Sequence, residues 1–428
     1  MTDPAELPTP RLRVVTREVA TIDDALAYTE PSNPTFWSRR GDAIAGYGET
    51  MVFTRTGDPA TLDFGARWRA LAANAEIDDP VVLPGTGLIA FGAFAFDPRS
   101  DVPSILSVPS IVVGRRGDRS WVTRITSARF DDDPPAGTLP ECTGYGPHWS
   151  ATLGPGSLDP AGYQAAVRAG LDAIAAGEVS KVVLARDLAG SVPPGSDLRR
   201  LVRALASGYP DCWAYAVDGM IGASPETLVT VSGGTVTARV LAGTAPRGAD
   251  ADADTAASLA LATSAKDQDE HLYAVQSVLA ALRPHASALA ASEQPFTLKL
   301  PNVFHLATDV EGQLSDGASA LDLVATLHPT AAVAGTPTDA ALGVIRRLEP
   351  LDRGRYAGPV GWVDAHGDGE WAIALRGAEF DLHSVPADGR DDIPFRAHAG
   401  AGIVTGSNPE TELLETRVKF RPIVDALA

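Results

Sequence analysis

The sequence feature that most constrains the fold is an apolar stretch at residues 179–186, with the sequence VSKVVLAR. Its apolar residues fall on both faces, as in a strand that is covered on both sides of a sheet. A helix is predicted directly before it, from Asp159 and Pro160 to Ala176, because apolar residues follow the helical period and Gly177 can end the helix. We therefore expect a sheet that is buried in the core.

One charged residue interrupts this strand. Lys181 shares a strand face with Val183 and Ala185, and lysine is almost never fully buried without a reason. Lys181 is either a strand-end side chain that extends to water, or a base whose pKa is lowered by desolvation. The local pattern leaves both readings open.

Composition narrows the class of protein. The 428 residues are 45% hydrophobic and 21% charged, which is typical of a soluble globular protein. The net charge of -19 argues against nucleic acid or an anionic membrane as partner, but not against a small anionic substrate. Two distant cysteines, no apolar leader and no apolar run of membrane-spanning length predict a cytoplasmic location.

The first 150 residues alternate short strand-like runs with Pro, Gly and Asp turns. No catalytic constellation is evident there. A segment rich in Pro and Gly, residues 131–156, is either a domain boundary or a long loop within one domain. The expected elements are strands at 11–15, 51–56, 87–96 and 105–113, and a helix at 62–75.

Two charged residues in the second half lie on apolar strands. Glu226 follows Pro225 and shares a face with Leu228, at the start of a predicted hairpin with strands at 227–231 and 235–241. Burial would raise its pKa, as a general acid requires. Arg376 is predicted to end a strand at 370–376, flanked by alanines that leave room for a carboxylate. Both could equally be exposed strand residues.

Acidic residues recur on two predicted helices. Ser264 caps the first, which carries Asp267 and Glu270 and is expected to bury Leu272 among other apolar residues. The second helix follows Gly400 and Gly402, two glycines that could line the approach to a site. It begins with Asn408 as N-cap and Pro409 at its first position, and Glu412, Glu415 and Lys419 share one face. Carboxylates can hold Mg²⁺, but a solvated helix face explains the same spacing.

Nine stretches in this order resemble the chorismate-utilising enzymes, which include isochorismate, salicylate, anthranilate and aminodeoxychorismate synthases. The resemblance covers residues 155–425 strongly and residues 1–150 weakly. It implies a single domain over 1–428, with an α/β (α+β) fold of large antiparallel sheets packed together, helices outside and a deep central pocket. The stretches are KVVLAR at 181–186, ASPE at 223–226, LAGTAPRG at 241–248, SAKDQDEH at 264–271, HL at 305–306, LHPTAAVAG at 327–335, RGRYAGPVGW at 353–362, GEWAIALR at 369–376 and AGAGIVTGSNPETELLET at 399–416.

Single residues separate the activities within this family. A lysine at the position of Lys181 activates water in isochorismate and salicylate synthases. Ala242 stands where aminodeoxychorismate synthases usually carry a nucleophilic lysine, which argues against covalent chemistry. Ala331 and Ala332 stand where salicylate synthases tend to have threonine. The resemblance thus implies an isochorismate synthase that feeds menaquinone or siderophore biosynthesis. The alternatives are a salicylate synthase and a non-catalytic chorismate-binding regulatory protein.

Position by position, the resemblance also implies roles for individual residues. Lys181 would activate water and Glu226 would protonate the departing hydroxyl, while His305 would be structural. The substrate would be chorismate, the cofactor Mg²⁺, and the protein a monomer without a glutaminase subunit. Glu270 and Glu415 would hold the metal, supported by Asp267 and Glu412; the substrate would be bound by Gly243, Thr244, Tyr356, Arg376, Gly400, Gly402 and Lys419.

Overall fold

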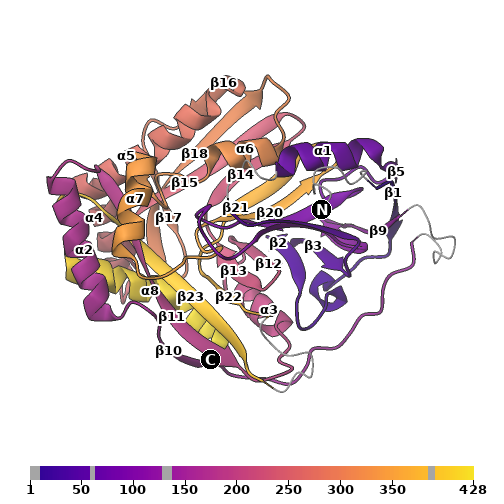
Figure 1. Ribbon diagram of the computed structural model, residues 1–428, viewed down its shortest axis with the longest axis horizontal. Coiled ribbons are helices and arrows are strands. Elements are labelled where there is room, and N and C mark those ends of the chain that lie inside the picture. The colour runs from indigo at the N-terminus through magenta and orange to yellow at the C-terminus, as the bar shows by residue number, and fades with distance from the viewer. Residues whose placement is uncertain (1–9, 58–62, 128–136, 384–390) are drawn as a thin grey trace, which may run out of the picture.

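The computed structural model describes residues 10–57, 63–127, 137–383 and 391–428. This part of the chain forms two large sheets with helices around them (Figure 1). The strand pairs are antiparallel except for β1 with β5, which is parallel. The predicted fold class is therefore confirmed.

The first sheet has 13 strands, in the order β10-β11-β23-β22-β13-β12-β2-β3-β8-β9-β1-β5, with β19 paired to β11. Both the N-terminal and the C-terminal parts of the chain contribute to it. Its strands are β1 (Leu12–Val19), β2 (Thr35–Arg39), β3 (Asp42–Tyr47), β5 (Glu76–Asp78), β8 (Ile111–Arg116), β9 (Arg119–Ser127), β10 (Thr152–Pro155), β11 (Lys181–Val192), β12 (Trp213–Val217), β13 (Met220–Ser224), β19 (Gly335–Thr336), β22 (Gly377–Phe380) and β23 (Ile393–Ile403).

The second sheet has 10 strands, in the order β16-β18-β15-β14-β21-β20-β6-β7-β4, with β17 paired to β18. It too draws strands from both ends of the chain. Its strands are β4 (Met51–Arg55), β6 (Ile89–Ala93), β7 (Ser104–Val108), β14 (Thr227–Ser232), β15 (Thr235–Pro246), β16 (Ala286–Ala291), β17 (Phe296–Lys299), β18 (Val303–Leu314), β20 (Pro359–Asp364) and β21 (Gly369–Ile373).

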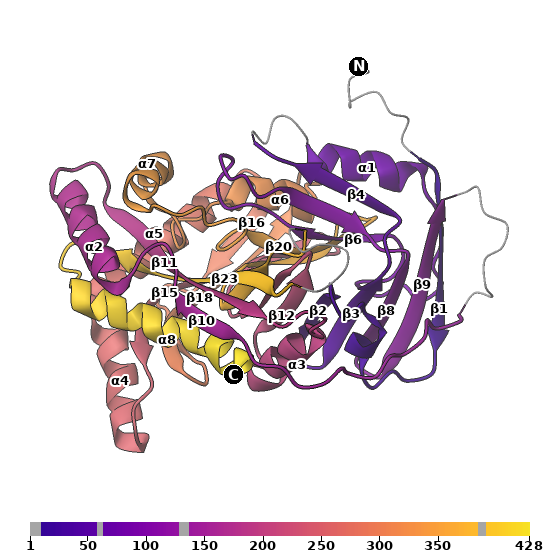
Figure 2. The same cartoon turned by 60° about the horizontal axis from the view of Figure 1, so that its bottom comes forward.

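Most of the helices gather at one end of the molecule, opposite the strands β1, β3, β8 and β9 (Figure 2). Helices α2 and α7 pack on β11, α8 on β23, and α5 on β15. The described residues contain no helix that is both long and apolar enough to cross a membrane. The helices are η2 (Ala25–Tyr28), α1 (Phe64–Asn74), α2 (Pro160–Ala175), α3 (Arg199–Gly208), α4 (Ala251–Thr263), α5 (Ala265–Leu282), α6 (Ala320–Leu327), α7 (Thr338–Leu348) and α8 (Pro409–Leu427).

The predicted helix starts follow from their caps. The Asp159 side chain accepts a hydrogen bond from the Gly162 N–H (2.7 Å) at the start of α2. Asn408 accepts from the Glu410 and Thr411 N–H groups at the start of α8, with Pro409 at the first helical position. These side chains satisfy backbone donors that a helix leaves without an internal partner.

Three local predictions need correction or restriction. Residues 105–113 form not one strand but the ends of two, β7 and β8, which lie in different sheets and are separated at Pro109, a residue without a backbone N–H. Leu272 is not buried on α5 but 54% exposed, because the buried face of that helix carries Glu270, His271 and Ala274. Residues 62 and 131–136, part of two predicted segments, lie outside the described residues.

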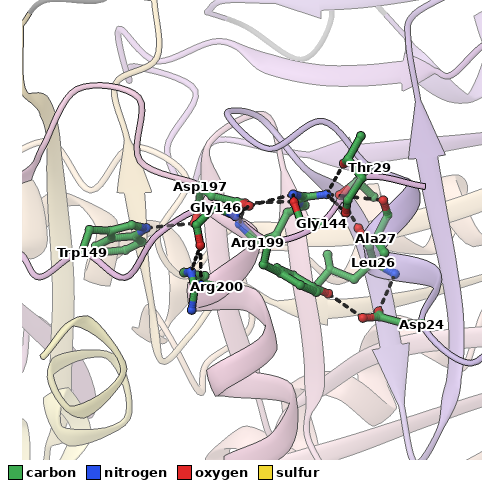
Figure 3. A network of polar contacts seen from close by, with 12 residues as sticks. Asp24, Leu26, Ala27, Thr29, Gly144, Gly146, Trp149, Asp197, Arg199 and Arg200 are labelled. Carbon is green, nitrogen blue, oxygen red and sulfur yellow. Dashed lines mark hydrogen bonds and ion pairs between the residues drawn. The ribbon is translucent and has the colours of Figure 1, made fainter. Parts of the chain in front are cut away.

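A buried arginine, Arg199 at the start of α3, binds the described part of the segment that connects the N-terminal and C-terminal halves of the chain (Figure 3). Its guanidinium donates to both carboxylate oxygens of Asp197 (2.9 and 2.7 Å) and to the carbonyl oxygens of Ala27, Thr143 and Gly144. Asp197 in turn accepts from the Gly146 N–H (2.8 Å). The described part of the Pro- and Gly-rich segment is thus tied to η2 and α3.

Candidate active site

The cavity that contains the predicted residues lies where the two sheets meet. It has about 630 Å³ of space that no atom fills, part of which is open to solvent. Strands β11 and β23 of the first sheet and β15 and β18 of the second supply much of its wall. It is lined by Val183, Pro225, Glu226, Leu241, Ala242, Gly243, Thr244, Glu270, His305, Ala332, Val333, Tyr356, Leu375, Arg376, His398, Ala399, Gly400, Gly402 and Lys419.

Two neighbouring crossings of the chain between the sheets line this cavity. The chain leaves β13 and enters β14 through Glu226, and it leaves β21 and enters β22 through Arg376. The crossings are hydrogen-bonded to each other, since the Ile373 N–H donates to the Glu226 carbonyl (3.2 Å) and the Ala223 N–H to the Arg376 carbonyl (3.3 Å). An acid and a cation 150 positions apart in the chain are thereby brought to one cavity.

Nine of the predicted residues line the cavity and four lie behind its wall. Lys181 contacts Glu270 and Glu415 contacts Lys419, so two of those four touch a lining residue. Asp267 lies directly behind Gly243, as a Cβ added there would be 3.1 Å from the Asp267 Cβ. The lining residues are Glu226, Gly243, Thr244, Glu270, Tyr356, Arg376, Gly400, Gly402 and Lys419; those behind the wall are Lys181, Asp267, Glu412 and Glu415.

Lys181 does not extend to water. Its side chain is 0% exposed, and its Nζ lies 3.3 Å from the Glu270 Oε1 but has no hydrogen-bond partner within the described chain. The reading as a strand-end lysine in solvent is therefore wrong. Gly402 makes the close approach possible, because a Cβ there would lie 2.1 Å from the Glu270 Oε1 and 3.0 Å from the Lys181 Cε.

Glu226 is buried beside the same cavity. Burial raises the pKa of its carboxyl to about 7, although Lys181 and the Leu241 N–H favour the charged form. The raised pKa expected for this residue is confirmed, and the reading as an exposed glutamate is wrong. A carboxyl with this pKa can both hold and release a proton near neutral pH.

Arg376 does not end a strand, contrary to the prediction. Strand β21 stops at Ile373, and Arg376 occupies the turn between sheets with φ of 55°, a strained conformation that is typical of functional sites. Its Nη2 donates to the Nε2 of His305 (2.9 Å), so the proton of this histidine lies on Nδ1, next to the Gly243 carbonyl and the Thr244 hydroxyl. Burial and Arg376 hold the His305 pKa well below its usual range.

The carboxylates predicted to hold a metal affect one another electrostatically. The Glu412 carboxylate pairs with Lys266 (2.8 Å) and Glu415 with Lys419 (2.6 Å). The Glu412 pKa is raised by burial and by the charge of Glu415. Its Oε2 is buried without a hydrogen-bond partner among the described residues.

Asp267 completes this acidic group, since its pKa is raised by burial, with Glu270 and Glu415 adding to the effect. Within the described ranges no three acidic, His or Cys side chains surround one point closely enough to enclose a metal ion. Oxygen ligands that repel one another and include an unpartnered oxygen nevertheless fit a hard divalent cation. Lysines balance their charge in this arrangement.

Several lining residues are absent from the sequence prediction, above all His398. The alternation of a strand could have indicated it, because His398, Gly400 and Gly402 share one face of β23. The apolar wall residues Val183, Val333 and Leu375 carry no chemical signal in the sequence, and only the packing of distant segments identifies them.

Comparison with known proteins identifies the family to which this fold and this cavity belong. A family model described as "Chorismate binding enzyme" matches residues 5–428. The chain belongs to this family of chorismate-binding enzymes.

Individual relatives share most of this chain. The isochorismate synthase DhbC of Bacillus subtilis is 41% identical over 63% of this chain and 68% of its own length. The isochorismate synthase EntC of Escherichia coli is 32% identical over 86% of this chain and 87% of its own. The solved structure of MenF, the menaquinone-specific isochorismate synthase from Escherichia coli, superposes with a TM-score of 0.76 and 25% identity, covering 97% of this chain and 95% of that one.

Proposed function

We propose that this protein is an isochorismate synthase that converts chorismate to isochorismate. Water adds to C2 of the ring, the hydroxyl leaves C4 as water, and the ring double bonds shift, so atoms and charge balance. The observation that carries the proposal is a buried glutamic acid in the cavity wall and a buried lysine directly behind that wall, in a chain whose relatives include isochorismate synthases.

The proposed roles follow from the position of each group. Lys181 takes a proton from the attacking water, since it is the buried amine next to the cavity without a hydrogen-bond partner in the described chain. Glu226 donates a proton to the departing hydroxyl, which its pKa of about 7 permits. Tyr356 and Arg376 hold the enolpyruvyl carboxylate, and the glycine backbone at 243, 400 and 402 lets the ring approach closely.

We further propose that Mg²⁺ is the cofactor. Glu270 and Glu415 would hold it, with Asp267 and Glu412 in support, because the charges of Glu270 and Glu415 raise the pKa of Asp267 and that of Glu415 raises the pKa of Glu412, and a cation would relieve this repulsion. When bound, the ion would neutralise the ring carboxylate of the substrate. Lys419, which donates to the Gly400 carbonyl (2.9 Å), keeps a second positive charge at this wall.

Ala332 presents a methyl group to the cavity, where salicylate synthases tend to have threonine, and this favours release of isochorismate without loss of pyruvate. Ala242 cannot act as a nucleophile, which argues against the covalent chemistry of aminodeoxychorismate synthases. We infer that the enzyme needs no ammonia and no glutaminase subunit. Two free cysteines, Cys142 and Cys212, favour a reducing, cytoplasmic location, and the product would enter menaquinone or siderophore biosynthesis.

The test is product identification from chorismate with Mg²⁺, with and without EDTA. Isochorismate without pyruvate, and no turnover in EDTA, is the expected result. Release of pyruvate would make the protein a salicylate synthase, while binding without consumption would make it a regulatory chorismate-binding protein. Lys181→Ala and Glu226→Gln should each abolish turnover and keep the fold; substantial activity in either variant would contradict its role.

A further inference from the structure

One cavity residue, His398, has no role in the mechanism above. It lies in a row of facing residues on β11 and β23, where Val183 is opposite Gly402, Ala185 opposite Gly400, and Asp187 opposite His398. The two glycines leave the floor of the cavity as bare backbone. Counted back along this face of β23 from Gly402, His398 is therefore the first residue with a side chain.

The imidazole of His398 is stacked on the ring of Tyr356. The ring centroids are 5.1 Å apart with an interplanar angle of 21°, which is a favourable offset-stacked geometry. His398 is 5% exposed, and its Nε2 is buried without a hydrogen-bond partner in the described chain. The ring is thus held by packing on Tyr356 and not by a hydrogen bond from that nitrogen.

Asp187 is the cross-strand neighbour of His398 on β11. Asp187 is 0% exposed and accepts hydrogen bonds from the Leu158 N–H (3.1 Å) and the Arg396 Nη1 (2.7 Å). Burial lowers the pKa of His398 to about 4, with Asp187 opposing this effect. The imidazole is neutral at physiological pH, so it acts on Tyr356 through its ring surface and not through a charge.

We propose that His398 is a positioning residue, which holds the ring of Tyr356 so that the phenol hydroxyl points at the substrate carboxylate. The proposal rests on the proposed function in assigning that carboxylate to Tyr356. Such a residue affects binding of the substrate in the ground state and the transition state alike, so it changes KM and leaves kcat nearly constant.

The test is a double-mutant cycle of His398→Ala and Tyr356→Phe, with kcat and KM measured for chorismate. Each single variant should raise KM about tenfold, the size of one lost hydrogen bond to a charged group. The double variant should be no worse than Tyr356→Phe alone, because the hydroxyl to be positioned is already gone. His398→Phe, which keeps a stacking ring, should recover most of the lost affinity. Additive losses, or no recovery in His398→Phe, would overturn the proposal.

A matched control separates this role from general destabilisation. Phe395→Leu removes a ring on the same strand that packs on Phe380 (5.2 Å between centroids) and does not line the cavity. It should lower the melting temperature without changing KM. If the wild type does not convert chorismate, the proposed function fails, and calorimetric Kd values for chorismate in the same variants still decide the role of His398.

Discussion

Burial raises the pKa of Glu226 toward neutral pH, as a general acid requires, and it lowers the free energy of unfolding wherever the carboxyl is ionised. A carboxyl group titrates near 4.5 when unfolded and at about 7 in the folded protein. The folded state then binds more protons than the unfolded state between these values, so stability falls as pH rises through this window. The shift corresponds to about 3 kcal/mol at pH 8.

Glu226→Gln tests both consequences at once. The variant should be inactive, yet more stable than the wild type at pH 8 by up to about 3 kcal/mol, with the difference vanishing near pH 4, below the unfolded pKa. Urea unfolding at the two pH values measures this. In the wild type kcat/KM should fall above pH 7, as the carboxyl loses its proton. Equal stability of the two proteins at pH 8 would show that Glu226 is not held protonated.

A substitution at Gly402 tests whether the contact between Lys181 and Glu270 matters for activity. A Cβ at this position would meet the Glu270 Oε1 at 2.1 Å, so Gly402→Ala must displace that carboxylate or Lys181. We expect kcat/KM to fall about a hundredfold, as for other small displacements of reacting groups. The control is Gly343→Ala in α7, where a Cβ meets nothing within 4 Å; it should keep full activity and gain up to about 1 kcal/mol of stability. Wild-type activity in Gly402→Ala would contradict the assignment.

At the scale of elements, strand β11 depends on side chains along one edge. One edge pairs with β23, while along the other the Glu349 carboxylate accepts from the Ala185 N–H (2.7 Å) and Arg353 donates to the carbonyl oxygens of Val183 (2.8 Å) and Val333 (3.0 Å). Glu349 and Arg353 are themselves a buried ion pair (2.6 Å). This pair joins the strand that carries Lys181 to the loop that lines the cavity.

Arg353→Met should destabilise the protein by about 3–5 kcal/mol, because it leaves the Glu349 carboxylate buried without its cation. The double variant Glu349→Leu/Arg353→Met should be less destabilised than Arg353→Met alone, since no uncompensated charge remains. Chemical denaturation measures both. A matched surface variant, Arg347→Ala, breaks an exposed ion pair with Glu178 and should change stability by less than about 1 kcal/mol. A double variant less stable than the single would contradict this account.

At the scale of the whole molecule, neither half of the chain forms a sheet alone. Residues before 128 supply β1, β2, β3, β5, β8 and β9 to the first sheet and β4, β6 and β7 to the second. The two halves therefore share their sheets, and the connection between them is fixed by Arg199 (Figure 3). Cooperative unfolding of the described chain as one unit is expected from this sharing.

Arg199→Met removes the donors that tie residues 143–146 to α3. We expect a single unfolding transition at lower denaturant concentration, with a loss of about 3–5 kcal/mol, because Asp197 would lose its buried partner. The control Arg11→Ala breaks an exposed ion pair with Glu76 and should leave the transition unchanged. Two separate transitions in Arg199→Met would show that the halves fold independently.

The sequence by itself determined what depends on neighbouring residues. The caps at Asp159 and Asn408, the hairpin at the turn of Gly233 and Gly234, and the motifs of the family are local patterns, and the family resemblance indicated nine of the residues that line the cavity. Only the tertiary structure decided the rest. The split of residues 105–113 between two sheets, the left-handed turn at Arg376 and the contact of His398 with Tyr356 each depend on segments far apart in the chain. The physical reason is that caps and turns are set by hydrogen bonds over a few residues, whereas burial and the pKa of Glu226 are set by the packing of both sheets around one cavity.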